Sequence, residues 1–80
     1  MPRGIANWTF NNVIRFLKEN KFRHSHTSGS HYFYIGYTNN TIRQVTVPFH
    51  GNRSIKPRTM KSIILQSGIS QDKWIGDKSD

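Results

Sequence analysis

A turn signal between two strand-like runs sets the main limit on what this chain can fold into. The runs HYFYIGY (31–37) and IRQVTVP (42–48) are rich in aromatic and β-branched residues, which favour strands. Between them lies TNNT, and paired asparagines suit the turn of a hairpin. Pro48 cannot continue a strand ladder, so the second run should end there. We therefore predict two antiparallel strands joined by a tight turn.

A helix is predicted before this hairpin and another after it. In the first, the apolar residues are spaced as on one helix face: Phe10, Val13, Ile14 and Leu17. Thr9 is its predicted N-cap and Asn20 its left-handed C-cap. The second helix should start near Pro57 and end at Gly68, and one more turn could follow at SQDKW.

Residues 22–26 are predicted to form a short strand, which completes an α-β-β-β-α order. This order predicts an α+β fold of the double-stranded-RNA-binding-domain type, a three-stranded antiparallel sheet with two helices on one face. We expect one domain over 1–80, with a core at about 9–76, a short extension at 1–7 and a tail at 77–80. Trp8 and Trp74 should close that core. The strand alternation leaves open whether Tyr32 and Tyr34, or Phe33 and Ile35, face the helices.

The charge balance indicates a polyanionic partner. Twelve Lys and Arg residues face four acids, which gives a net charge of +8 at pH 7. Nucleic acid fits this charge best, a membrane surface fits it less well, and an acidic protein is the alternative. The chain has no cysteine, which excludes disulfides and thiol chemistry, and no segment approaches about 20 apolar residues. We expect a cytoplasmic protein without a membrane role.

His31 stands directly after a turn, at Gly29 and Ser30, and opens the aromatic run. Imidazole can take and give a proton near neutral pH, and RNA carries its own nucleophile in the 2′-hydroxyl. Gly29 and Ser30 would let a phosphate approach closely and could supply N–H donors. The other interpretation is that His31 merely begins a strand, and its position alone favours that one.

The basic segment HGNRSIKPRT (50–59) is a candidate phosphate-binding surface. It places His50 and three cations, Arg53, Lys56 and Arg58, beside a predicted helix start, where free N–H groups favour anions. A solvated basic loop is an equally good interpretation.

Metal binding is not expected, and neither is a cofactor. His24 and His26 are two residues apart on a predicted strand and should share a face. No cysteine supports them, few carboxylates do, and no two histidines have the helical H-x3-H spacing.

Three stretches in order resemble the HicA-type mRNA interferase toxins of bacterial and phage toxin–antitoxin systems. They are LKENKF, GSHYFY and VTVPFHGNRSIKPRTMKSIILQSGI, and the resemblance extends from about Thr9 to Trp74. Two positions depart from the family pattern, because Lys21 and Arg58 stand where that pattern has glycine. The stretches 1–7 and 77–80 have no counterpart in it.

The resemblance implies ribosome-independent cleavage of mRNA, with His31 as the catalytic residue, and a HicB-type antitoxin that covers the site. On this basis we expect a metal-independent endoribonuclease, a monomer in the free state, in which His31 acts as general base or general acid. Water or a second group must complete the proton transfers, and His50 is the nearest candidate in the sequence for such a group. A non-catalytic RNA-binding module of the same fold is the alternative.

Overall fold

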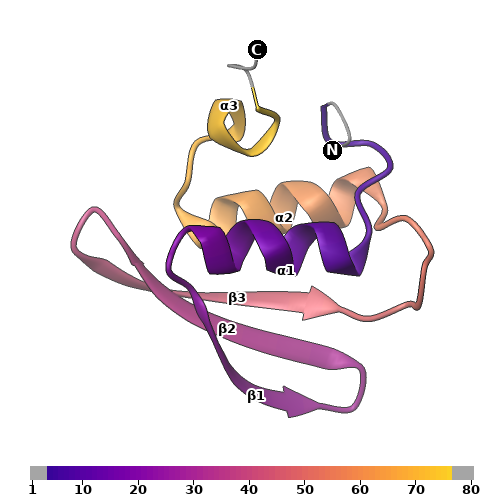
Figure 1. Cartoon of the computed structure of the whole chain (residues 1–80), viewed down its shortest axis with the longest axis horizontal. Helices are drawn as coiled ribbons and strands as arrows, with labels where there is room; N and C mark the ends of the chain where they lie inside the picture. Colours follow the sequence, from indigo (N-terminus) through magenta and orange to yellow (C-terminus); the bar gives the residue numbers. More distant parts are fainter. Residues whose placement is uncertain (1–3, 77–80) are drawn as a thin grey trace.

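The computed structural model describes residues 4–76 as one sheet with helices on one of its faces (Figure 1). The elements are α1 Phe10–Glu19, β1 Arg23–Ser28, β2 His31–Thr38, β3 Thr41–Pro48, α2 Pro57–Ser67 and α3 Gln71–Trp74. The sheet is antiparallel in the order β1-β2-β3. This confirms the predicted α+β fold of the double-stranded-RNA-binding-domain type. The predicted tail at 77–80 and the first three residues of the predicted extension lie outside the described residues.

The alternation along β2 decides which side chains are available to a partner. Tyr34 is buried in the core cluster with residues of α1 and α2, and Gly36 is buried against the Phe22 ring, whereas His31 and Tyr37 are exposed. The side of Tyr32 and Tyr34 is therefore the core side. We call the opposite side the open face, and within residues 4–76 no element covers it (Figure 1). On β2 it carries the odd-numbered side chains: His31, Phe33, Ile35 and Tyr37.

The hairpin turn forms as the paired asparagines predict. Asn39 and Asn40 have φ values of 54° and 64°, and Thr38 pairs with Thr41. Positive φ at both central residues is the conformation whose twist matches that of the flanking strands. The tight turn therefore fixes the register of β2 against β3.

Trp8 and Trp74 close the core, as predicted, on the side of the helices away from the sheet. Both are buried, and Trp74 stacks on Phe16 with ring centroids 4.0 Å apart. Trp8 meets Trp74 edge-on at 5.5 Å. The indole N–H of Trp74 donates to Ser67 Oγ at 3.1 Å, so these two buried polar groups are paired with each other. The predicted extra turn is α3, and it seats Trp74.

The predicted left-handed C-cap at Asn20 is wrong, because Lys21 takes that conformation. Asn20 has φ −102°, and Lys21 has φ 71°. The N–H of Phe22 donates to Leu17 O at 2.9 Å and that of Lys21 to Lys18 O at 3.0 Å, the two bonds of a Schellman motif. Asn20 is the C-cap of α1 without being left-handed, and its amide side chain donates to Phe16 O. The left-handed residue therefore falls one position later.

We expect Lys21→Gly to stabilise the fold by about 0.5–1 kcal/mol. A left-handed non-glycine residue costs about 1–2 kcal/mol, and the greater unfolded-state freedom of glycine cancels part of the gain. Urea denaturation measures the change. Lys18→Gly is the matched control inside the same helix and should destabilise by roughly 0.5–1 kcal/mol. A Lys21→Gly variant no more stable than wild type would contradict this interpretation of the cap.

Candidate nucleic-acid interface

His31 is exposed at the first position of β2, on the open face. Its Cα partners are Ser28 on β1 and Pro48 on β3. The turn before it has Gly29 at φ +59°, with no atom within 4 Å of the space that a side chain there would take. The carbonyl of Ser30 accepts a hydrogen bond from the N–H of Phe49 at 2.8 Å. This bond joins the turn before His31 to Phe49, the residue between the end of β3 and the basic segment.

Three aromatic rings brace this end of the sheet against α1. Phe10 lies edge-on to Tyr32, with centroids 4.8 Å apart, and to Phe49 at 5.0 Å. Burial, with a smaller contribution from Tyr32, raises the pKa of Tyr34 above its ordinary value. Tyr32 and Tyr34 therefore lie on the core side, where they pack beneath the start of β2.

The basic segment turns back to the core before α2. The N–H of Arg53 donates to His50 O at 3.2 Å, closing a turn through Gly51 at φ +63°. Ile55 is buried, and its N–H donates to Trp8 O at 2.6 Å. The side chains of His50 and Arg53 remain exposed to solvent.

A hollow of about 380 Å³ lies between the end of β3 and the start of α2. Lys56 is the N-cap of α2, without a side-chain cap bond, and Pro57 occupies the first helical position. The first N–H groups of this 11-residue helix therefore add a partial positive charge beside the cations. The residues that line the hollow are Pro48, His50, Arg53, Ser54, Ile55, Lys56 and Thr59. Arg58 is exposed on α2 and is not one of them.

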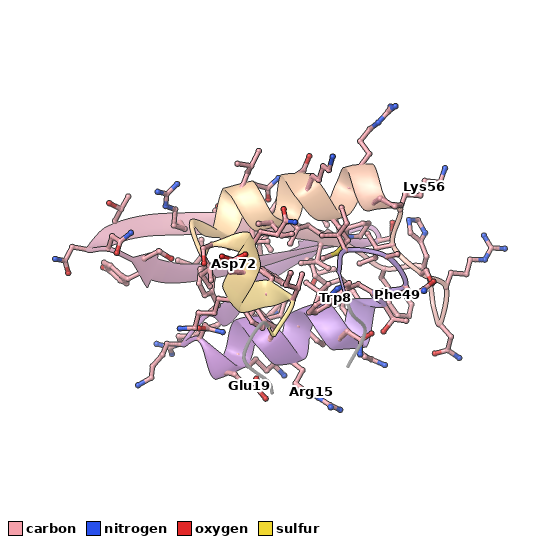
Figure 2. The ribbon with its side chains drawn as sticks, turned by 90° about the horizontal axis from the view of Figure 1, so that it is seen from above. Trp8, Arg15, Glu19, Phe49, Lys56 and Asp72 are labelled. Atoms are coloured by element: carbon pink, nitrogen blue, oxygen red, sulfur yellow. The ribbon has the colours of Figure 1, made fainter. Side chains whose placement is uncertain are left out.

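The charges of the described residues are separated along the molecule. Glu19 and Asp72 are the carboxylates within 4–76. Figure 2 shows both on the side of the helical layer away from Lys56 and Phe49. The hollow and the end of the sheet beside it therefore keep their positive charge. Such a surface favours an anion.

The prediction that His24 and His26 share a face is wrong. The register slips between them, so that His24 pairs with Tyr34 but His26 pairs with Phe33. The His24 ring lies 5.5 Å from that of Tyr34, on the core side. The His26 ring stacks on Phe33 with centroids 4.3 Å apart, on the open face. A bulge of one residue at Ser25 separates the two histidines, because it shifts the alternation by one position.

The structure brings most of the predicted site residues to one end of the sheet. His31, which follows Gly29 and Ser30, pairs with Pro48, and the hollow that Pro48 lines is also lined by His50, Arg53 and Lys56. Arg58 stands apart from that group. Among residues 4–76 no group of three histidines or carboxylates is arranged to hold a metal ion, and no helix is long and apolar enough to cross a membrane.

Fold and surface together define a small α+β domain of the double-stranded-RNA-binding-domain type, with a basic hollow at one end of its sheet. The family described as HicA toxin of bacterial toxin-antitoxin matches residues 10–69. The chain belongs to this family, and it is the toxin component of a toxin–antitoxin pair. Such a toxin has a partner antitoxin. No curated protein and no solved structure matches the chain.

Proposed function

We propose that this toxin is an endoribonuclease that cleaves mRNA without a metal ion, with His31 as the general acid or general base. The observation that carries the proposal is the contact between the start of β2 and the end of β3. His31 pairs with Pro48, and the Ser30–Phe49 hydrogen bond of 2.8 Å joins the residue before β2 to the residue after β3. An exposed imidazole therefore stands next to the strand end from which the basic segment departs.

The reaction needs only a proton acceptor, a proton donor and cations. The 2′-hydroxyl of RNA gives up its proton, and its oxygen then bonds to phosphorus. The bond from phosphorus to the 5′ oxygen breaks, and that oxygen takes a proton. The products are a 2′,3′-cyclic phosphate and a 5′-hydroxyl. His31 performs one of the two transfers, and either contributes about 10²–10⁴-fold to the rate.

The substrate phosphates bind beside His31 in this proposal. Arg53 and Lys56 neutralise phosphate charge from the hollow, together with the start of α2. His50 lies in the same hollow, and Arg58 contributes charge from the exposed face of α2. Gly29 and Ser30 let the RNA backbone approach, because no atom occupies the space beside Gly29.

The partner antitoxin in this proposal is a HicB-type protein that covers His31 and the hollow. The toxin is a monomer when free, and the antitoxin blocks access of mRNA to the site. Adding the antitoxin should therefore abolish both RNA binding and RNA cleavage. Continued cleavage by the complex would contradict this arrangement.

The direct experiment is incubation of an end-labelled RNA with purified protein in the presence of EDTA. We expect fragments that end in a 2′,3′-cyclic phosphate. RNA that is bound but stays intact would favour the alternative, a non-catalytic RNA-binding module of the same fold, which the positive charge and the basic hollow also support. Weak binding without a steep salt dependence would favour an acidic protein as the partner instead.

Salt dependence tests the role of the hollow. We expect the double variant Arg53→Ala/Lys56→Ala to bind single-stranded RNA more weakly, and its plot of log K against log salt to be shallower by about 0.7 for each lost phosphate contact. Arg15→Ala/Lys18→Ala is the matched control, because it removes the same charge from the exposed surface of α1, where Figure 2 labels Arg15. Equal changes of slope in both variants would show that the hollow has no special part.

A further inference from the structure

We infer that His26 is the second proton-transfer residue, paired with His31 across β1 and β2. This inference rests on the proposed ribonuclease function and supplies the group that the mechanism above leaves unnamed. It starts from the strand register, which places two exposed imidazoles on the same face of the sheet.

The bulge at Ser25 places His26 on the open face. From His26 onward the pairing is regular: His26 pairs with Phe33, Thr27 with Tyr32 and Ser28 with His31. His26 is therefore the diagonal neighbour of His31, two residues from its direct partner. Diagonal neighbours on one face of an antiparallel pair lie about 7–8 Å apart. Without the bulge, His26 would face the helices instead.

The ring of His26 is held in one orientation. It stacks on Phe33 with an interplanar angle of 5°, and Nδ1 lies 3.1 Å from Ser25 Oγ. Among the described residues, the ring contacts its neighbours through Nδ1, so Nε2 is the nitrogen that faces a substrate. An imidazole fixed on two sides loses little freedom when it engages a substrate, which favours a positioned acid–base group.

The separation of the two histidines suits the reaction. In an in-line displacement the attacking and leaving oxygens lie on opposite sides of phosphorus. Each oxygen must lie within about 2.6–3.2 Å of the group that exchanges its proton. Two rings must therefore flank the phosphate. One imidazole takes the 2′-hydroxyl proton as the oxygen–phosphorus bond forms, and the other, protonated, gives its proton to the departing 5′ oxygen.

The other described candidates are less well placed. His24 lies on the core side of the sheet against Tyr34. His50 lies in the hollow beyond the end of β3. Glu19 and Asp72, the carboxylates within 4–76, belong to the helical layer (Figure 2). Among residues 4–76, His26 is thus the acid–base side chain that lies on the open face, diagonally across the strand pair from His31.

The test is the cleavage kinetics of His26→Gln as a function of pH. We expect kcat to fall about 10²-fold or more with little change in KM, because the lost group acts on the reaction rather than on binding. The bell-shaped pH profile of the wild type should lose one limb. A full rate with both limbs intact would overturn the inference, and so would a raised KM with unchanged kcat.

His24→Gln is the matched control, because it changes a neighbouring exposed histidine on the other side of the sheet, and it should leave rate and pH profile unchanged. Loss of the same pH limb in His50→Gln, but not in His26→Gln, would also overturn the inference. Retention of the wild-type melting temperature by His26→Gln separates a kinetic effect from unfolding. If His31→Ala is inactive while His26→Gln is fully active, this inference alone fails. If the wild type does not cleave RNA, the proposed function fails with it.

Discussion

His31→Ala should lower the rate of RNA cleavage by about 10²–10⁴-fold while the fold stays intact. The imidazole is exposed and contributes nothing to the core, so its removal leaves the packing of the sheet unchanged. RNA affinity should also change little, because the cations that would bind phosphate lie in the hollow at the start of α2. A single-turnover assay in EDTA measures the rate, and a binding assay at the same salt concentration measures the affinity.

The control for this substitution is His24→Ala, which removes an equally exposed imidazole from the core side of β1. It should cleave RNA at close to the wild-type rate. Expression in cells gives a second readout: the wild type alone should arrest growth, and His31→Ala should not. Unchanged cleavage by the His31→Ala protein would remove His31 from the mechanism, whether or not the variant arrested growth.

Local signals predicted the elements of this fold well because each depends on a few neighbouring residues. Thr9 caps α1 through a reciprocal pair of bonds with Asn12. Gly68 has φ 73° and ends α2 as expected. Each of these features is decided by backbone groups within a single turn, so the residues that cause it stand next to one another in the sequence.

The orientation of β2 could not be predicted, because it depends on contacts between distant residues. Both sides of the strand carry aromatic side chains, so the alternation is ambiguous. Packing resolves it: the Phe22 ring lies so close to Gly36 that a Cβ there would be 2.6 Å from Phe22 Cγ. The Phe22 ring therefore fits only against the face of β2 that carries Gly36, and this face becomes the core side. His31, at an odd position, is consequently on the open face.

The bulge at Ser25 was equally hidden, although it matters most for the site. A run such as RHSHTS has no apolar alternation, so nothing in it marks the point where the register slips. The slip appears only in the pairing with β2, where His24 and His26 meet Tyr34 and Phe33. The sequence therefore predicted His31 as a candidate but missed His26, and it kept His50 as the nearest second group.

The measurement that tests the central claim most directly is cleavage of an RNA that carries one 2′-deoxy sugar at the cut site. The attacking oxygen in the proposed reaction is the 2′-hydroxyl oxygen of the substrate itself. The modified RNA should bind as tightly as unmodified RNA, because its phosphates are unchanged. Cleavage at the modified position should cease, and cleavage at other sites should continue. Cleavage of the 2′-deoxy position at the normal rate would contradict the account, because the nucleophile would then be water or a protein group.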